Sequence, residues 1–171
     1  MQNDSKRQGS DPESLNWYAL KVFFNRTRRF EELLEPLVSE MYVPRNVITS
    51  LMFVRTSPTQ IENIRQKWYG WLMVYVSRPD RTPYIIPEHD MDVFRFVTSM
   101  ADKNLKLIDP EAVRFKSGEK VRVTDGLFKG AEGYIKRIQG NKRLIVTIHG
   151  VVAVATSYIP AAYLEKLENN D

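Results

Sequence analysis

The chain has 171 residues, of which 43% are hydrophobic and 27% charged, a composition that supports one medium-sized core or two small ones. No apolar run approaches the about 20 residues of a membrane span, and no apolar stretch near Met1 resembles a secretory signal, so we expect a cytoplasmic protein without a membrane partner. The absence of cysteine excludes disulfides and thiolate metal sites, and the thinly spread net charge of +4 argues against a dedicated duplex-DNA binder.

The first predicted elements are a tail, a strand and a helix. Residues 1–14 are polar and lack an apolar period, which predicts a disordered tail. Residues 17–23 alternate as a strand does, and Asn25 is a plausible N-cap for the helix that follows. Its apolar stripe consists of Phe30, Leu33, Leu34, Leu37 and Val38. Pro36 lies within this stripe and predicts a kink or an early end of the helix.

The middle of the chain continues this alternation of strands and helices. Ser57 as cap, Pro58 in the first turn and Gln60 in a capping box predict a helix that ends near Lys67. Pro87-Glu88 opens another helix, with Met91, Phe94 and Val97 on its apolar stripe. Further extended segments are predicted at residues 41–43, 51–55, 72–76 and 84–86.

The order β-α-β-β-α-β with an appended helix predicts an α+β fold, with a ferredoxin-like N-terminal domain over residues 15–108. Two helices should cover one face of its antiparallel sheet, and residues 105–108 are expected to add an edge strand. Residues 109–113 are predicted to form a linker, and residues 114–171 a second domain.

The second domain is predicted to be a small SH3-like β-barrel. Strands are expected at residues 120–124, 132–138, 143–148, 151–156 and 164–167. Gly126, Gly130 and Gly133 suit the corners of a curved sheet, and they precede a strand, whereas a phosphate-binding loop must open a helix.

No residue pattern indicates catalysis. His89 and His149 are distant in sequence and lie near no carboxylate cluster with ligand spacing, so we expect surface histidines and no metal or cofactor. No serine, threonine or lysine lies in a recognisable nucleophile context. The chain is therefore expected to be a binding protein and not an enzyme.

Several motifs carry a resemblance to a known family. Residues 118–138, GEKVRVTDGLFKGAEGYIKRI, resemble the KOW motif, and Trp17-Tyr18-Ala19-Leu20-Lys21-Val22 resembles the opening of the NusG N-terminal (NGN) domain. Residues 41–44 and 82–87 match later parts of that domain in the same order. From residue 15 to about 168 the chain thus resembles NusG-like transcription elongation and antitermination factors. Residues 150–160 are similar to the antiterminators of capsular polysaccharide operons in Bacteroidetes-type bacteria.

The resemblance implies a monomer whose N-terminal domain binds the clamp helices of the largest RNA polymerase subunit. The implied polymerase contacts are Tyr18, Ile48, Leu51 and Phe53. Strand alternation gives equal weight to the alternative that these side chains fill the core. The segment that matches the family's FPGYVxV pattern, residues 48–54, lacks its proline, glycine and tyrosine.

A second implied contact is with the non-template DNA strand, through Arg26, Arg28 and Arg29. We favour the alternative that these arginines form a solvated helix face that pairs with Glu31 and Glu32. The aromatic cluster Trp68, Tyr69 and Trp71 is compatible with packing or with an interface, and the sequence leaves both open.

In the family the KOW domain recruits a small-subunit ribosomal protein or the Rho terminator. The implied contacts here are Phe128, Ile148 and Val151, of which Phe128 is the first choice because it lies on a loop with little core to fill. The rival hypothesis is an RNA-binding or ribosome-associated KOW protein. Its basic surface would consist of Lys129, Lys136, Arg137, Lys142 and Arg143.

The hairpin that the family usually carries after the second strand is short here, with three residues between Pro44 and Ile48. Either the hairpin is truncated or a segment is missing from the sequence. We predict the second, with the gap between Arg45 and Val47, so that Cα atoms there would lie farther apart than the about 3.8 Å of a trans peptide.

Overall fold

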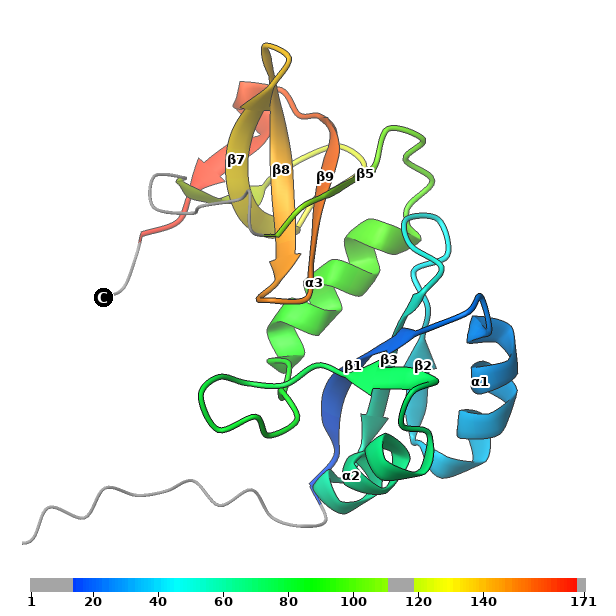
Figure 1. Ribbon diagram of the computed structural model, residues 1–171. Coiled ribbons are helices and arrows are strands. Elements are labelled where there is room, and N and C mark those ends of the chain that lie inside the picture. The colour runs from blue at the N-terminus through cyan, green and yellow to red at the C-terminus, as the bar shows by residue number, and fades with distance from the viewer. Residues whose placement is uncertain (1–13, 111–118, 169–171) are drawn as a thin grey trace, which may run out of the picture.

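The computed structural model describes residues 14–110 and 119–168 and contains two antiparallel sheets and three α-helices in those ranges (Figure 1). The first sheet has the order β2-β3-β1-β4 and consists of β1 (Asn16–Val22), β2 (Glu40–Tyr42), β3 (Leu51–Thr56) and β4 (Leu72–Val74). The helices are α1 (Thr27–Leu34), α2 (Pro58–Lys67) and α3 (Glu88–Ser99), with short 3-10 turns η1 (Glu35–Leu37) and η2 (Ala161–Tyr163).

The second sheet has the order β10-β6-β7-β8-β9-β5. Its strands are β5 (Lys106–Ile108), β6 (Lys120–Val123), β7 (Glu132–Ile138), β8 (Asn141–Ile148), β9 (Val152–Tyr158) and β10 (Leu164–Lys166). We call residues 14–105 the first module and the described residues from 106 onward the second module. The prediction of a mixed fold with two β-containing units is confirmed.

One face of the first sheet is covered by α1 and α2. Side chains alternate along β1, so Tyr18 and Leu20 point to this face, with Met52 and Val54 of β3 beside them. Phe30 of α1 and Ile61 of α2 close the cluster, and all of these side chains are buried. This core is built entirely from the first module, as the predicted pair of helices on one face requires.

The opposite face of the same sheet is covered by α3. Trp17 and Ala19 of β1 point to it together with Phe53 of β3, and the Phe53 and Phe94 ring centroids lie 5.3 Å apart. The predicted apolar stripe of α3 is confirmed, because Met91, Phe94 and Val97 are buried. A helix that buries one stripe against a sheet gains the burial free energy that its own backbone propensity does not supply.

The sequence signals for helix ends were confirmed at two positions and wrong at a third. Ser57 caps α2 as predicted, with the Gln60 amide donating to Ser57 Oγ over 3.1 Å, and α2 ends at Lys67. Pro36 ends α1 early, as predicted, by forcing the chain into η1. The prediction of Asn25 as N-cap is wrong by one residue, because Asn25 has a φ of 54° and Arg26 takes the N-cap position.

The segment between β2 and β3 is a tight turn. The Val47 amide donates to the Pro44 carbonyl over 3.0 Å, and the Ile48 amide donates to the same oxygen over 2.9 Å. Such bonds span three and four residues of one continuous chain. The predicted gap between Arg45 and Val47 is therefore wrong, and the hairpin is truncated.

The boundary between the modules differs from the predicted one. Lys106–Ile108 was expected at the edge of the first sheet, but β5 pairs with β9 of the second sheet, with Leu107 opposite Val154. The backbone groups of β5 thus bond to β9, a strand that lies far away in sequence. The predicted linker at 109–113 and the predicted tail at 1–14 lie almost wholly outside the described residues.

The second sheet contains strands near all five predicted positions, and β5 extends it. Gly133 of β7 lies in close contact with β8, because a Cβ there would meet the Ile145 carbonyl oxygen at 2.4 Å. Only glycine permits that approach. Among the described helices, none has the length and apolar character that crossing a membrane requires.

Candidate functional site

The candidate site is the contact between the two modules, where α3 lies between the two sheets (Figure 1). One buried cluster contains side chains from both sides, with Phe53 and Phe94 from the first module and Val146 and Val154 from the second. Helical spacing places His89, Val93, Phe96 and Met100 away from the Met91–Phe94 stripe. The apolar members of this module-facing stripe, Val93, Phe96 and Met100, are partly buried against the shared cluster.

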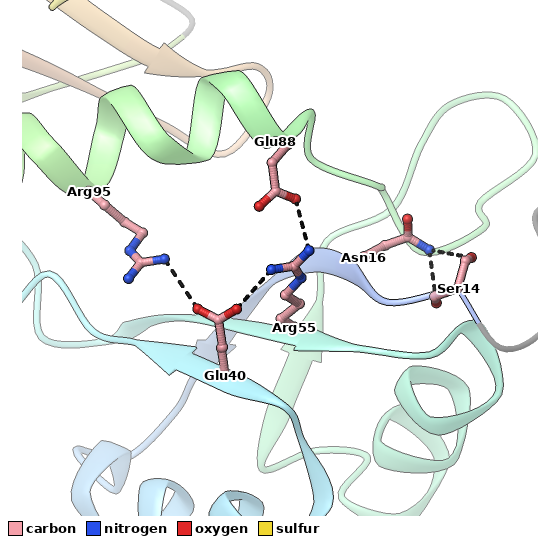
Figure 2. A network of polar contacts seen from close by, with 6 residues as sticks. All are labelled: Ser14, Asn16, Glu40, Arg55, Glu88 and Arg95. Atoms are coloured by element: carbon pink, nitrogen blue, oxygen red, sulfur yellow. Dashed lines mark hydrogen bonds and ion pairs between the residues drawn. The ribbon is translucent and has the colours of Figure 1, made fainter.

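A charged network holds α3 on the first sheet (Figure 2). Arg55 of β3 lies between two carboxylates, 2.8 Å from Glu40 and 3.5 Å from Glu88, and Arg95 of α3 lies 3.4 Å from Glu40. The Arg55 hydrogen bond lowers the pKa of the Glu40 carboxyl, and the charge of Arg95 adds to the effect. Arg95 also lies over the Trp17 ring, 5.3 Å from its centroid. The network therefore fixes the rotation of α3 about its axis.

Two polar contacts join the first module directly to the second. The His89 ring nitrogen Nε2 lies 3.0 Å from Glu132 Oε2 of β7, and the Ser157 amide of β9 donates to Asp102 Oδ2 over 2.8 Å. Arg122 of β6 binds the same Glu132 carboxylate at 2.7 Å. The Arg122 hydrogen bond, followed by the His89 contact, lowers the pKa of Glu132, whose side chain is 15% exposed. Both ends of α3 are thus tied to the second module.

A groove of about 1360 Å³ runs along this contact and is lined by both histidines. His89 and His149 are exposed, as predicted for surface histidines. Across the described part of the chain, no group of histidine and carboxylate side chains could hold a metal ion. The groove is lined by side chains from both modules, among them Tyr75 and Val93 of the first and Val146 and Val151 of the second.

A second candidate surface lies at the start of α1. Arg26, Arg28 and Arg29 are all exposed, and the Arg26 guanidinium carbon lies 4.3 Å from the Trp71 ring centroid. The expected pairing with the helix carboxylates is wrong for Glu31, which binds Arg45 instead. Of the aromatic cluster, Trp68 packs on Phe30 with centroids 5.9 Å apart.

The remaining aromatic side chains of this surface face solvent. Tyr69 is 86% exposed, Trp71 43% and Phe24 72%. The sequence already places Phe23 and Phe24 beside the three arginines, where their rings could stack bases. Phe23 and Phe24 are adjacent at the end of a strand, and alternation sends neighbouring side chains to opposite sides, so one of the two is expected to face solvent.

Comparison with solved structures identifies the fold. No family model and no curated protein matches the sequence. A structure that describes domain interaction in Thermotoga maritima NusG matches with a TM-score of 0.51 and 17% sequence identity, covering 91% of this chain and 98% of that one. The fold is that of NusG. The MjSpt4:Spt5 complex matches with a TM-score of 0.34 and 10% identity, over 91% of this chain and 99% of that one.

On this NusG-like fold the predicted polymerase contacts do not form one surface. Tyr18 faces α1 and α2, whereas Leu51 and Phe53 face α3, because neighbouring register positions alternate across the sheet. All three side chains are at most 2% exposed. The expectation that they form an accessible patch is wrong for this structure, and Ile48, which is partly buried, is the accessible member of the set.

The predicted partner contacts of the second module are buried as well. Phe128 is 3% exposed, Ile148 1% and Val151 9%. The expectation that Phe128 has little core to fill is wrong, because the Gly130 amide bonds the Val123 carbonyl over 2.7 Å and folds this loop back on the sheet. Leu127, its neighbour, is 55% exposed instead.

Four of the five residues of the rival basic surface lie on the β7–β8 hairpin, whereas Lys129 lies on the loop before β7. Strand alternation places the two cross-strand pairs of this hairpin on opposite faces of the sheet. Lys136 pairs with Arg143 and Arg137 pairs with Lys142, so each cross-strand pair carries two like charges. Like charges directly opposite each other destabilise a sheet. A contribution to folding stability therefore does not explain why these like-charged pairs are present.

Proposed function

We propose that this chain is a bacterial transcription elongation factor with antitermination activity, which acts by binding and without catalysis or a cofactor. The NusG-like fold, which extends over both modules, carries the proposal. The first module would be a ferredoxin-like NGN domain and the second a KOW barrel. The factor would act in the cytoplasm as a monomer. The apolar segment 150–160 favours capsular polysaccharide operons as its targets.

In this proposal the first module docks on the clamp helices of the largest RNA polymerase subunit. A helical partner needs an apolar face on its receptor, with side chains that become buried on binding. The module-facing stripe of α3 supplies such a face through Val93, Phe96 and Met100, which are partly buried where the modules meet. Docking on this stripe would require the second module to move away.

The second module would recruit another factor, either a small-subunit ribosomal protein or Rho. Val151 and Ile148 border the turn between β8 and β9, which lies beside α3 in Figure 1 and lines the same groove as His89. Separation of the modules would expose this turn together with the stripe. Polymerase docking and factor recruitment would then be linked by one movement.

The test is a pull-down of purified core polymerase with the full chain, followed by an in vitro pausing assay. We expect Val93→Asp to reduce polymerase retention at least tenfold, because it places a charge in an apolar contact. Leu127→Asp is the matched control, since Leu127 is an exposed apolar residue of the second module. Circular dichroism would verify that both variants are folded.

Equal retention of Val93→Asp and the parent chain would exclude this stripe as the docking surface. Absence of polymerase binding by the parent chain would exclude the proposed function itself. Phe53→Asp is unsuitable for this test, because Phe53 is 0% exposed and a buried charge there would unfold the module.

The second candidate function is direct RNA binding by the like-charged β7–β8 ribbon. Such a ribbon would neutralise phosphates, so its affinity for RNA would fall steeply with salt. The test is RNA affinity across a salt series for the parent chain and for Lys136→Gln/Arg137→Gln. If RNA binding is strong, salt-dependent and lost in this variant while polymerase retention is absent, the second candidate replaces the first.

A further inference from the structure

The groove between the modules contains the side chains that titrate near neutral pH. The chain has two histidines, and both line this groove, His89 from α3 and His149 from the turn between β8 and β9. Histidine is the side chain whose charge ordinarily changes between about pH 5 and 8. Because the chain has no cysteine, a change of pH over this range acts on side-chain charge mainly where the modules meet.

His89 contacts an ionised carboxylate of the other module. Its Nε2 lies 3.0 Å from Glu132 Oε2. The other oxygen of this carboxylate accepts from Arg122 Nη2 over 2.7 Å and from Arg122 Nε over 3.0 Å. The Arg122 hydrogen bonds lower the pKa of Glu132, so its charge is present throughout the range in which a histidine titrates. A neutral imidazole offers this carboxylate a dipole, whereas an imidazolium offers a full charge.

Charges of the first module do not couple the protonation of His89 to the module contact. Those around this end of α3 are Glu88, Asp90 and Asp92 of the helix itself, Arg55 of β3 and Lys21 of β1, while Tyr75 and Tyr84 stay neutral because burial raises their pKa values. The carboxylates favour a proton on His89, and the helix N-terminus disfavours it. All of these groups act on the imidazole whether or not the modules are in contact. Only groups of the second module can therefore make the contact depend on the proton.

The second module presents charges of both signs, and the carboxylate of Glu132 is the one in contact with His89. Arg122 binds the other oxygen of that carboxylate, and its own charge is shared with Glu165 at 3.9 Å. The other titratable groups of this module that line the groove are Asp109, Lys120, Tyr134 and His149. The attraction between two charges falls with distance, and water in an open groove screens the more distant ones. The direct contact decides the sign, so a proton on His89 favours contact between the modules.

We propose that His89 is a pH-sensitive latch between the modules, which tightens when the imidazole gains a proton and loosens when it loses one. The contribution is complete on the acid side of the histidine range and disappears as the pH rises through that range. It has a lower limit as well, because Glu132 loses its charge as the pH falls through its lowered pKa, below the ordinary 4.5. The contact is thus tightest in weakly acidic conditions. This device goes beyond the proposed function and requires no polymerase.

The other end of α3 supplies an internal comparison. There the Ser157 amide donates to Asp102 Oδ2 over 2.8 Å, and the Asn104 amide donates to Asp102 Oδ1 over 2.9 Å. This tie contains no histidine, so its charge does not change between about pH 5 and 8. Loss of either tie should loosen the contact, but only the loss of His89 should remove its pH dependence.

The test counts separated molecules by single-molecule fluorescence energy transfer. Because the chain has no cysteine, Tyr69→Cys and Leu127→Cys place one dye on each module of the full chain, at side chains that are 86% and 55% exposed. The ratio of separated to closed molecules should be about two- to fivefold higher at about pH 8 than at about pH 5.5, the range expected for an exposed ion pair. In His89→Gln, which keeps a hydrogen-bond donor without a charge, the ratio should not depend on pH.

Three further variants locate the response. His149→Gln removes the other histidine of the groove and should keep the full pH dependence. Glu132→Gln should abolish it, because the charge that attracts the imidazolium is lost. Asp102→Ala should raise the ratio by a similar factor at both pH values. Because the His89 side chain is 63% exposed, thermal unfolding of His89→Gln should match that of the parent chain.

A ratio that does not change with pH in the parent chain would overturn the latch, as would the absence of separated molecules at both pH values. A pH dependence that persists in His89→Gln and is lost in His149→Gln would also overturn it and assign the response to the β8–β9 turn.

A double-mutant cycle of His89→Gln and Glu132→Gln gives a second measure, because residues of two modules are coupled only where the modules are in contact. Their coupling in urea unfolding should be larger at about pH 5.5 than at about pH 8, and equal coupling would contradict the proposal. None of these assays contains polymerase, so the proposed function can fail without changing their outcome.

Discussion

The two faces of the first sheet are covered in different ways. The face under α1 and α2 is sealed by side chains of the first module, such as Leu20, Met52 and Ile64. The face under α3 belongs to a cluster that continues into the second module and includes Phe94 and Val154. A self-contained core and a shared core therefore lie on opposite sides of one sheet, and only the shared core can respond when the modules separate.

The sharpest test of this difference is a pair of substitutions that each create a cavity, one in the shared core and one in the self-contained core. Phe94→Ala in the shared core should lower the free energy of unfolding by about 3–5 kcal/mol, because it removes a buried ring. Ile64→Ala in the self-contained core should cost about 2–5 kcal/mol. Denaturant unfolding gives these values. Amide chemical shifts should change in both modules for Phe94→Ala and in the first module alone for Ile64→Ala.

A smaller effect is expected from a methyl group placed between two strands of the second module. Gly133→Ala would put a Cβ at 2.4 Å from the Ile145 carbonyl oxygen, so the backbone must shift. We expect a cost near the upper end of the about 1–3 kcal/mol typical of overpacking. Gly70→Ala is the control, because Gly70 has a φ of 85° but open space around it and should show strain alone. Equal melting temperatures of the two variants would contradict a steric clash between the added Cβ at position 133 and β8.

The polar bridge between the modules predicts a pH dependence. Because Arg122 lowers the pKa of Glu132 below the ordinary 4.5, the carboxylate contributes stability above that value and loses it as the pH falls through the lowered pKa. Glu132→Gln should therefore cost about 1 kcal/mol at neutral pH, where the charged hydrogen bonds are intact. Unfolding free energies of both proteins should converge in acid. A constant difference down to pH values far below 4.5 would argue against this linkage.

The smallest effect belongs to a residue outside both cores. Leu127→Ala truncates a side chain that is 55% exposed, so the unfolding free energy should change by less than about 0.5 kcal/mol. Thermal unfolding provides the measurement. A large loss would mean that the Leu127 side chain itself is packed in the shared core, as that of its neighbour Phe128 is.

Sequence patterns predicted the elements that depend on near neighbours. The capping of α2 by Ser57 and the early end of α1 at Pro36 rest on hydrogen bonds and ring geometry within one turn. The predicted gap near Arg45 failed because the turn was compared with a longer hairpin, while Pro44 and Val47 close a complete turn on their own.

The candidate surfaces were less predictable because exposure depends on distant segments. Phe128 is on a loop by every local sign, yet the hydrogen bond from the Gly130 amide to the Val123 carbonyl folds this loop back and Phe128 is buried. Phe24 follows a buried strand, yet its positive φ turns it outward. Neither outcome is contained in the residues next to them.

The amino-acid order by itself determined the succession of strands and helices and the two faces of β1, because backbone hydrogen bonding and side-chain alternation act over a few residues. The tertiary structure alone decided that β5 joins β9 and that α3 is covered by the second module. Both depend on contacts between segments separated by tens of residues, whose free energy comes from burying complementary surfaces.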